Sequence, residues 1–429
     1  MPTIKNFRNL EVSPMNITIH RGSHQIGGSC IELSAGNSRI LLDIGKALPS
    51  LDETTLDETA LLPGVKVLID KKAIDAVLIS HSHGDHVGLI GQVKPAIPVY
   101  IGKAALHIYN TTALFTGGKT LANPTFFFES GQPLKIGDFT ITPYLVDHSG
   151  YDAYGFLIEA GGKAVVYTGD FRDHGKKAKA TEYFKKHLPS GIDALLIEGT
   201  MMSRSTEALE TEDQLEDKAR ELMQSSNQPV LVLQSSTNID RLVGMYRAAT
   251  RSGRLFVMDI FTAHIVSQLA PSIPKPSSSF DSIRVIYPFW LTRKMFEKDH
   301  VHLMNQFSRY KIKREELSQR QDYCLLFRPS MLSDLQHIDQ LEGAEMIYSQ
   351  WSGYKHQKKI KAVLDFADQK TMTLTDLHTS GHASTQALKA FIQQCNPRMV
   401  LPIHTENPDG FLECGNRVYL PQDGERIRL

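Results

Sequence analysis

The chain has 429 residues, of which 41% are hydrophobic and 22% are charged, the balance of a folded globular protein rather than a disordered one. This length is too great for one ordinary core and is enough for two packed domains. Lys and Arg together number 47, as do Asp and Glu, which excludes a polycation. A nucleic-acid partner would therefore have to be bound by a local patch or by metal ions in an active site.

Cysteine usage and the N-terminus both bear on the compartment. The four cysteines are scattered and form no CxxC pair, which suits neither a disulfide framework nor a thiolate zinc site. Residues 1–16 lack the apolar segment of a signal peptide, and no apolar run reaches the roughly 18–20 residues of a membrane helix. We therefore expect a cytoplasmic protein with no membrane partner. The cysteines are Cys30, Cys324, Cys395 and Cys414.

The first predicted elements along the chain are mostly β-strands. Short β-rich runs alternate with glycine turns, and the run 73–80 is continuously apolar, as in a strand buried on both faces. The pattern indicates mixed α/β structure with a sheet-rich core. The predicted strands lie within residues 16–45, 73–80, 139–148, 154–170 and 192–200.

The pattern changes after Glu198. A charged helical stretch at 206–226 is followed by strand 230–236, helix 239–253 and strand 255–259, a βαβ-like rhythm. The strand-and-histidine pattern of the first third returns from about residue 370. The simplest interpretation is a middle domain inserted into the first one. We place a first domain segment at 1–200, the inserted domain at 201–368 and the completing segment at 369–429.

The clearest chemical signal is the run His81-Ser82-His83-Gly84-Asp85-His86, directly after the apolar strand 73–80. Four ligand types within six residues converge only if the backbone turns tightly, which Gly84 permits. Imidazoles combined with carboxylates suit Zn²⁺, with Mn²⁺ as the alternative where oxygen ligands are more numerous.

Three further sites each place a ligand type just after an apolar β-run. They are Asp147-His148, Asp170 and His404. A single histidine after a strand is more often a structural polar residue. The joint occurrence with the HxHxDH run makes that interpretation a poor one here.

At this point the chain resembles the metallo-β-lactamase superfamily, whose signature HSHGDH matches. The resemblance implies an αββα sandwich with two Zn²⁺ ions, which together lower the pKa of a bridging water and supply a hydroxide nucleophile. Asp43 matches the family's first motif, with an expected role in orienting the ligand loop; a turn residue that caps a strand is the alternative. The ligands implied by the resemblance are His81, His83 and His148 for one metal, Asp85, His86 and His404 for the other, and Asp170 for both.

Three further motifs resemble motifs A, B and C of the β-CASP nucleases, the branch that holds ribonuclease J. They are Glu198 after strand 192–200, the run 378–384 (HTSGHAS) and His404. The segment 347–354 (IYSQWSGY) is also similar to a β-CASP segment. The expected fold class is therefore α/β, a metallo-β-lactamase sandwich with an inserted β-CASP α/β domain.

By the same resemblance, His382 is the general acid for the leaving 3′-oxygen and Glu198 is its carboxylate partner. A carboxylate beside an imidazole favours its protonated form. Apolar positions at 388, 391, 392 and 395 predict a helix that starts at 384–385, and free N–H groups at a helix N-terminus favour phosphate. The predicted catalytic residues are Asp85, His382 and Glu198, and the predicted phosphate-binding residues at this loop are His378, Ser380, Gly381 and Ser384.

Two further segments have both a functional and a structural interpretation. Ser235 and Ser236 occupy the place where ribonuclease J-like proteins contact RNA phosphate, although an ordinary helix N-cap explains the run 234–238 equally well. Residues 284–320 interleave basic and aromatic side chains, which suits single-stranded nucleic acid. Acidic residues dilute that stretch, and a solvated amphipathic helical face is the better interpretation.

The expected function is that of a two-zinc metallohydrolase that cleaves single-stranded RNA, by attack of a metal-bridged hydroxide with a histidine as general acid. Exonuclease action from the 5′ end, endonuclease action and homodimerisation all stay open. Histidine at motif C resembles the RNA-processing members of the branch, whereas the DNA-repair members typically carry valine. The alternatives are a DNA nuclease of the same branch, a small-molecule ester or thioester hydrolase, and a catalytically silent scaffold. The pair Glu198 and His382 argues against the second, and the complete ligand set argues against the third.

Overall fold

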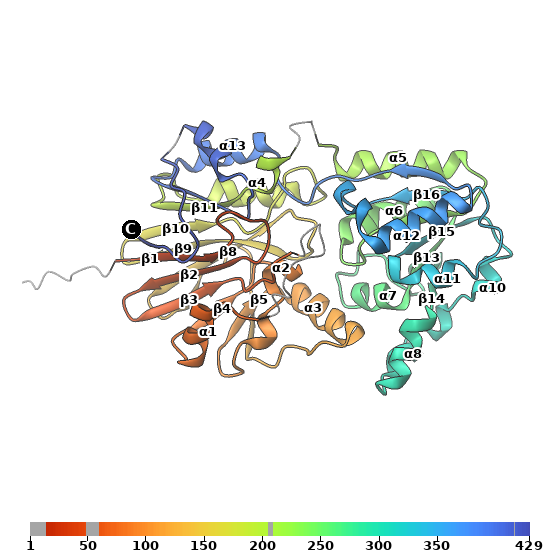
Figure 1. Cartoon of the computed structure of the whole chain (residues 1–429), viewed down its shortest axis with the longest axis horizontal. Coiled ribbons are helices and arrows are strands. Elements are labelled where there is room, and N and C mark those ends of the chain that lie inside the picture. The colour runs from red at the N-terminus through yellow and green to blue at the C-terminus, as the bar shows by residue number, and fades with distance from the viewer. Residues whose placement is uncertain (1–13, 49–59, 205–208, 416) are drawn as a thin grey trace, which may run out of the picture.

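The computed structural model describes residues 14–48, 60–204, 209–415 and 417–429. Two bodies lie side by side, one built on two sheets and the other on a third sheet (Figure 1). Both ends of the described chain belong to the first body, because β19 pairs with β1. The middle of the chain forms the second body, as expected of an inserted domain.

The first sheet has seven strands in the order β19-β1-β2-β3-β4-β5-β6. Buried and half-buried residues alternate along β1, as the period of a strand with one face in the core requires. Within the predicted strand 73–80, the residues that pair in the sheet form β4. Strand β4 lies between β3 and β5 and is parallel to both. The strands are β1 (Asn16–Arg21), β2 (Cys30–Ala35), β3 (Ser38–Leu42), β4 (Ala76–Leu78), β5 (Val99–Ile101), β6 (Thr125–Phe127) and β19 (Arg426–Arg428).

The second sheet has six strands in the order β18-β11-β10-β9-β8-β7. Strand β9 is antiparallel to both β8 and β10, whereas β10, β11 and β18 are parallel. The carboxyl ends of β8, β10, β11 and β18 therefore meet at one edge. The strands are β7 (Leu134–Ile136), β8 (Phe139–Val146), β9 (Ala153–Ala160), β10 (Lys163–Tyr167), β11 (Ala194–Glu198) and β18 (Val400–Ile403).

The two sheets pack face to face and helices cover their outer faces. A shared core joins Ile17 and Ile31 of the first sheet to Phe156 and Leu196 of the second. Separate clusters place α1 and α3 against the first sheet and α4 and α13 against the second. This is the expected αββα sandwich. The helices of this body are α1 (Pro63–Asp70), α2 (Gly84–Val87), α3 (Lys103–Thr116), α4 (Ala178–His187) and α13 (Thr385–Cys395).

The third sheet is wholly parallel, with the strand order β14-β13-β15-β12-β16-β17. Helices α5, α6 and α7 pack on one face, and α11 and α12 pack on the other. The second body therefore has the α/β structure that we expected of the inserted domain. The strands are β12 (Val230–Leu233), β13 (Leu255–Asp259), β14 (Ile283–Ile286), β15 (Tyr323–Phe327), β16 (Glu345–Tyr348) and β17 (Thr373–Asp376).

The helices of the second body include the predicted helical stretches. The stretch 206–226 contains α5, which begins after the N-cap Thr211; its residues 206–208 lie outside the described part of the chain. The third sheet runs as far as Asp376, and the domain limits at 200 and 368 stay a prediction. The helices are α5 (Glu212–Ser225), α6 (Ile239–Arg251), α7 (Ile260–Ser267), α8 (Phe289–Glu297), α9 (Val301–Asn305), α10 (Arg314–Leu317), α11 (Leu332–Leu335) and α12 (Lys358–Gln369).

Within the described residues, no helix has both the length and the apolar character needed to cross a membrane.

Candidate metal centre and active site

The predicted ligands lie where the strands of the two facing sheets end. His81 and His83 follow β4 in the first sheet, and Asp85 and His86 lie on the short helix α2. His148, Asp170 and His404 follow β8, β10 and β18, whose carboxyl ends share one edge of the second sheet. The fold therefore converts scattered sequence positions into one cluster.

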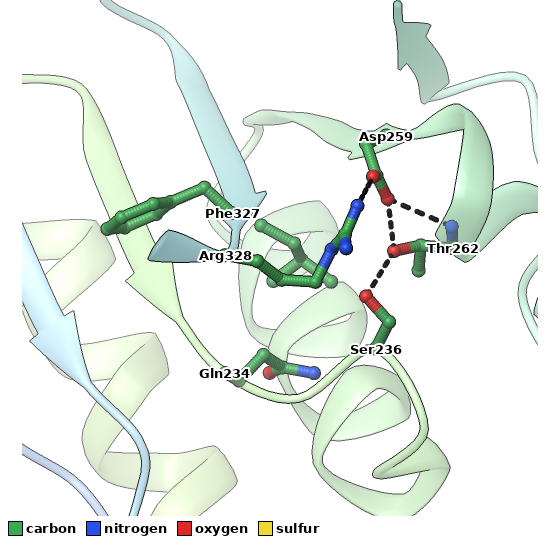
Figure 2. A pocket seen from close by; sticks show the side chains of 7 residues that line it. Gln234, Ser236, Asp259, Thr262, Phe327 and Arg328 are labelled. Carbon is green, nitrogen blue, oxygen red and sulfur yellow. Dashed lines mark hydrogen bonds and ion pairs between the residues drawn. The ribbon is translucent and has the colours of Figure 1, made fainter. Parts of the chain in front are cut away.

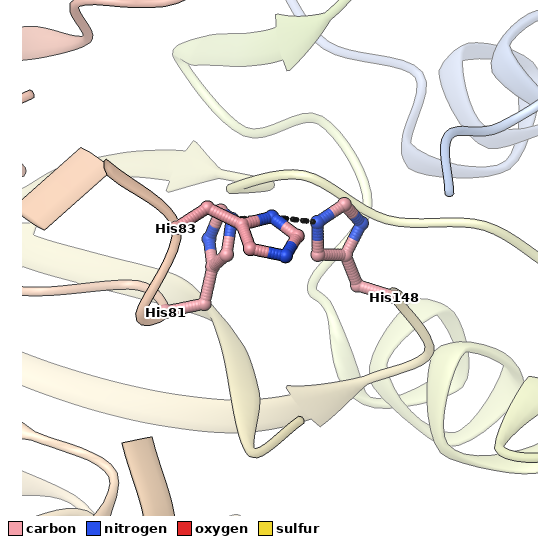
Figure 3. Close-up of side chains that lie close together, drawn as sticks. All are labelled: His81, His83 and His148. Atoms are coloured by element: carbon pink, nitrogen blue, oxygen red, sulfur yellow. Dashed lines mark hydrogen bonds between the residues drawn. The ribbon is translucent and has the colours of Figure 1, made fainter. Parts of the chain in front are cut away.

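The first group of ligand atoms comes from His81, His83 and His148, which all lie within 4.8 Å of one another. His83 Nδ1 is 3.1 Å from His81 Nε2 and 3.1 Å from His148 Nε2 (Figure 3). Burial and the neighbouring imidazoles hold the pKa values of His81 and His148 well below the usual range. Burial also lowers the pKa of His83, so the surroundings of all three rings favour the neutral form that binds metal ions.

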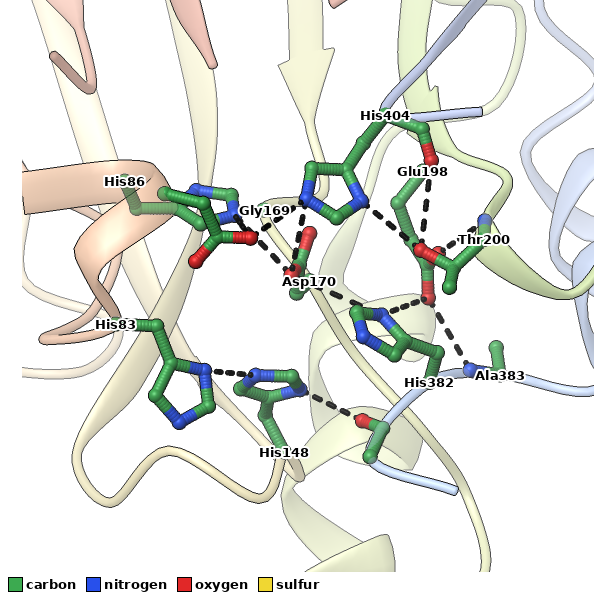
Figure 4. A network of polar contacts seen from close by, with 12 residues as sticks. His83, His86, His148, Gly169, Asp170, Glu198, Thr200, His382, Ala383 and His404 are labelled. Carbon is green, nitrogen blue, oxygen red and sulfur yellow. Dashed lines mark hydrogen bonds and ion pairs between the residues drawn. The ribbon is translucent and has the colours of Figure 1, made fainter. Parts of the chain in front are cut away.

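The second group comes from Asp85, His86, Asp170 and His404, again within 4.8 Å. Asp170 Oδ2 lies 3.1 Å from His86 Nε2, 3.8 Å from His404 Nε2 and 4.0 Å from His81 Nε2. Asp170 therefore lies within 4.0 Å of a member of each group, and Figure 4 shows it beside His86 and His404. Burial raises its pKa, but the charges of His404 and His86 outweigh burial and leave that pKa well below the usual range.

The Asp43 carboxylate contacts His86, a member of the second group, at the ring nitrogen that does not face Asp170. This carboxylate also accepts hydrogen bonds from Ser80 N and Oγ, both at 2.7 Å, and from Tyr167 Oη at 2.5 Å. His86 Nδ1 donates to the same carboxylate at 2.8 Å, which leaves Nε2 facing Asp170. Asp43 has a φ of +59°, a backbone conformation that an Asp tolerates better than most residues. The contacts of Ser80 and Tyr167 were not expected, because neither residue has a motif of its own.

His382 and Glu198 lie next to this cluster. His382 Nδ1 is 3.5 Å from Glu198 Oε1 and 3.7 Å from Asp170 Oδ2. Backbone N–H groups of Ala383 and Thr200 hydrogen-bond the buried Glu198 carboxylate at 3.1 and 2.9 Å and fix its position. The Thr200 hydroxyl also lies 2.9 Å from His404 Nδ1. This contact, which the sequence did not predict, links the segment after Glu198 to His404.

The side chains of the cluster fit divalent cations. Among the described residues, three buried atoms that face the cluster have no hydrogen-bond partner: His86 Nε2, Asp170 Oδ1 and His382 Nδ1. Buried polar atoms without partners are costly, and a cation would satisfy the first two. Neutral imidazoles with ionised carboxylates form the donor set that Zn²⁺ prefers.

Comparison with known proteins agrees with this geometry. A family model described as a beta-lactamase superfamily domain matches residues 38–233, and a model described as a Zn-dependent metallo-hydrolase RNA specificity domain matches residues 371–409. Ribonuclease J of Helicobacter pylori strain B128 is 21% identical over 97% of this chain and 60% of its own length. These matches support assignment of the chain to the metallo-β-lactamase superfamily, in its ribonuclease J-like β-CASP branch.

Other relatives show how the chain compares in length and shape. An RNase J-like protein of Methanocaldococcus jannaschii is 27% identical over 57% of this chain and 58% of its own. The crystal structure of a protein of unknown function from Enterococcus faecalis V583 has the same fold, with a TM-score of 0.77, 21% identity and coverage of 97% of this chain and 100% of the other. The chain spans about 60% of the length of the Helicobacter pylori ribonuclease J proteins that it matches.

The β-CASP motif B loop, residues 378–384, reaches the cluster through its backbone. The carbonyl of Gly381 accepts a hydrogen bond from His148 Nδ1 at 2.6 Å, and a side chain at Gly381 would meet Ser149 Oγ at 2.4 Å. Ser380 Oγ accepts from the N–H of His382, and Ser384 Oγ accepts from the N–H of Ala387 as the N-cap of α13. Ser380 Oγ also lies 3.4 Å from Met201 Sδ, so both hydroxyls already take part in hydrogen bonds within the protein.

The remaining predicted phosphate-binding residues are His378, Ser235 and Ser236, which differ in their exposure. His378 is exposed. Ser235 is exposed and lies 2.9 Å from Thr237 Oγ1, whereas Ser236 is buried and accepts a hydrogen bond from Thr262 Oγ1 at 2.8 Å. Ser236 lines a small pocket at the ends of β12, β13 and β15, together with Asp259, Thr262 and Arg328 (Figure 2). The N-cap of the following helix α6 is Asn238, which accepts from Arg241 N.

A buried ionic network supports the motif B loop from the side of the inserted domain. Arg172, fully buried, lies 3.2 Å from Asp147, 2.9 Å from Glu212 and 2.9 Å from Asp240. Arg241 binds the other oxygen of Glu212 at 2.8 Å and donates to the carbonyl of Leu377 at 3.1 Å. Sequence reasoning missed this network, since its members are charged residues far apart in the chain with no shared motif.

Proposed function

We propose that the chain is a two-zinc metallohydrolase that cleaves phosphodiester bonds of single-stranded RNA. The observation that carries the proposal is the position of His382, between Glu198 and Asp170 and beside both groups of metal-ligand atoms. A hydrolase of carboxylic esters needs the metal ligands but no such additional acid–carboxylate pair. The ribonuclease J names of the relatives and the RNA specificity description of the second family model support RNA as the substrate.

In this proposal the two groups of ligand atoms hold two cations. His81, His83 and His148 hold one, Asp85, His86 and His404 hold the other, and Asp170 contributes to both. When bound, the two cations activate water near neutral pH and offset the negative charge of the attacked phosphate. Zn²⁺ fits the imidazole-rich donor set, and Mn²⁺ is the alternative.

His382 supplies the proton for the leaving 3′-oxygen. Its Nδ1 faces Glu198 and Asp170, so Nε2 is the nitrogen left to donate to the substrate. Glu198 acts by positioning: two backbone N–H groups hold its carboxylate, and the carboxylate in turn holds the His382 ring. A positioned general acid typically contributes about 10²–10⁴-fold in rate.

The motif B loop binds the substrate phosphate next to that acid. Ser380, Gly381 and Ser384 provide loop backbone and hydroxyl groups, and the exposed His378 provides an imidazole on the same loop. Ser235 joins them from the inserted domain, while Ser236 would have to leave its contact with Thr262 to do so. The sizes of the labelled RNA fragments distinguish stepwise removal of nucleotides from the 5′ end from internal cuts.

The test incubates purified protein with a 5′-monophosphorylated single-stranded RNA labelled at its 3′ end, beside DNA of the same sequence. Wild type is expected to cleave the RNA, to lose that activity with a chelator and to regain it with Zn²⁺ or Mn²⁺. His382→Ala is expected to be slower by at least about 10²-fold. His302→Ala removes an exposed histidine of α9 and serves as the matched control.

Metal content decides how a negative result is interpreted. Elemental analysis is expected to find two zinc or manganese ions per chain. Protein that holds two ions and cleaves neither polymer would overturn the proposal and favour an ester or thioester substrate. Preferential cleavage of the DNA would instead assign the chain to DNA.

A further inference from the structure

An arginine from the first body lies against a tryptophan from the second body. Arg204 follows the short 3₁₀ helix η2 (Thr200–Ser203), which begins just after Glu198. Its Cζ atom lies 4.3 Å from the centroid of the Trp351 ring, in the segment before η5 (Ser352–His356). The Trp351 ring in turn contacts Tyr354 edge-on, with the ring centroids 5.3 Å apart.

Arg204 and Trp351 are both half-buried, and Arg204 has no ion-pair partner among the described residues. No carboxylate of that part of the chain lies within ion-pair distance of its guanidinium, unlike the paired Arg172, Arg241 and Arg328. Burial lowers the pKa of Arg204, and the charges of Tyr354, Glu406 and Glu198 only partly offset that effect. A desolvated guanidinium without a carboxylate is a site that an external anion stabilises.

The same side chains lie close to the metal cluster. Burial and the carboxylate of Asp85, a ligand of the second group, raise the pKa of Tyr354, while the charge of Arg204 acts in the opposite direction. Tyr354 is therefore within electrostatic reach of both Asp85 and Arg204. Glu198, the partner of His382, is also among the charges that act on Arg204. Thr200, four residues before Arg204, lies 2.9 Å from His404 Nδ1 through its hydroxyl, so the chain itself brings Arg204 close to the cluster.

The backbone of the inserted domain holds the aromatic partner in place. The carbonyl of Trp351 accepts a hydrogen bond from Tyr348 Oη at 3.0 Å, and Tyr348 is buried at the end of β16. Lys355, next to Tyr354, pairs with Asp376 at the end of β17 at 2.8 Å. A ring fixed in this way restricts the rotamers of the Arg204 side chain that lies on it. Arg204 therefore loses less conformational entropy when it binds a ligand.

We propose that Arg204, held over Trp351, binds a non-bridging phosphate oxygen of the nucleotide next to the bond that is cleaved. The proposal rests on the proposed function, since it assumes a nucleic-acid substrate. A guanidinium presents a planar set of N–H donors that matches phosphate and also stacks on an aromatic ring, whereas a lysine ammonium does neither. In this role Arg204 and Trp351 form a specificity element for polynucleotides over small esters.

The chain offers a direct spectroscopic test, because it has only two tryptophans, Trp290 and Trp351. Trp290→Phe leaves Trp351 as the one tryptophan, and Trp290 lies exposed on α8. A phosphorothioate RNA tetramer that resists hydrolysis is titrated into this variant while tryptophan emission is recorded. A saturable change in emission is expected, and Arg204→Ala in the same background is expected to weaken it roughly ten- to a hundredfold.

A matched control comes from the second arginine–tryptophan contact. Arg293 Cζ lies 5.6 Å from the Trp290 ring centroid, but Arg293 is exposed and already paired with Glu297 at 2.9 Å. Arg293→Ala, with Trp351 as the reporter, is expected to bind the tetramer as tightly as its parent. Arg204→Lys keeps the charge without the planar group, and its affinity is expected to fall between those of arginine and alanine.

Cleavage kinetics separate this proposal from the proposed function. Arg204→Ala is expected to raise KM for RNA more than it lowers kcat, with an unchanged thermal melting midpoint. An Arg204→Ala enzyme with the KM of wild type, or a Trp351 signal that does not respond to the tetramer while wild type cleaves RNA, overturns the role of Arg204 and leaves the nuclease function intact. Binding of the tetramer that depends on Arg204, in a protein that cleaves no RNA, supports the phosphate site and contradicts the nuclease function.

Discussion

Arg172 Nη1 donates a hydrogen bond to the carbonyl oxygen of Ser380 at 3.1 Å, inside the protein. The same guanidinium binds Asp147, the neighbour of the predicted metal ligand His148, and Glu212 of the inserted domain. His174 Nε2 also lies 2.9 Å from the Ser380 carbonyl. One buried side chain thus ties the loop that carries His382 to the strand end that carries His148, and both of them to the second body.

Replacement of Arg172 by methionine is expected to destabilise the protein. The change keeps the length of the side chain but leaves the carboxylates of Asp147, Glu212 and Asp240 without this partner. Breaking a buried ion pair on one side typically costs about 3–5 kcal/mol, so the free energy of unfolding in urea should fall by a comparable amount. Arg320→Met, which removes an exposed arginine, is the control. An unchanged free energy of unfolding for Arg172→Met would contradict the role assigned to the network.

The ion pairs of Glu212 predict a defined loss of stability in acid. Burial raises its pKa, but Arg241 and Arg172 outweigh burial and hold it at about 2, below the ordinary value of 4.5. Because the folded-state pKa is depressed, the stabilisation is complete above about pH 4.5 and is lost as the pH falls towards 2. Unfolding free energies measured between pH 6 and pH 2 should therefore fall more steeply for wild type than for Glu212→Gln. Glu221→Gln changes an exposed residue of the same helix and should follow the wild-type curve.

Asp43→Asn is expected to weaken metal binding without removing a ligand. The substitution replaces the Asp43 carboxylate, which accepts hydrogen bonds from Ser80, Tyr167 and His86, by a neutral amide. The His86 ring is then no longer held with Nε2 towards Asp170. Loss of such a supporting contact typically costs about 10–100-fold in metal affinity. Titration with a chelating indicator should show one of two bound ions released more readily than in wild type. Asp70→Asn, at an exposed ion pair with Lys66, should release both ions as wild type does.

Glu198→Gln is expected to slow cleavage while the protein keeps its fold and metal content. A glutamine oxygen can still accept from Thr200 N or Ala383 N, but the side chain no longer holds His382 by charge. We expect kcat for RNA to fall by roughly 10–100-fold, part of the contribution of a positioned acid. Single-turnover rates at saturating RNA measure this directly. A rate equal to that of wild type would show that His382 does not depend on Glu198.

Much of the metal centre follows from local sequence features with a simple physical basis. His81, His148, Asp170 and His404 come within three residues of the end of an apolar strand, and the carboxyl ends of β8, β10, β11 and β18 meet because these strands run in the same direction. Residues that follow parallel strands are brought together by the sheet itself. The run His81–His86 needs only a tight turn to present its side chains. The grouping of these ligands could therefore be predicted without coordinates, and their metal-binding role stays a prediction.

Other features depend on packing between distant segments and have no local signature. Ser236 looked like a phosphate-binding residue in the sequence, yet in the fold it hydrogen-bonds Thr262 in a separate pocket. The hydroxyls of Ser380 and Ser384 accept hydrogen bonds from the backbone N–H groups of His382 and Ala387, which periodicity alone could not reveal.

The sequence by itself determined the mixed α/β structure, the inserted body and the ligand types at the strand ends, because hydrophobic periodicity and ligand type are local properties. The αββα sandwich was implied by the resemblance to the metallo-β-lactamase superfamily. Only the tertiary structure decided which charged side chains are buried together. The partners of Arg172 are Glu212 of α5, Asp240 of α6 and the Ser380 carbonyl of the motif B loop. Arg204 contacts Trp351 of the other body. A buried charge is stable only beside partners that the fold brings to it, so its role cannot be assigned before the fold is known.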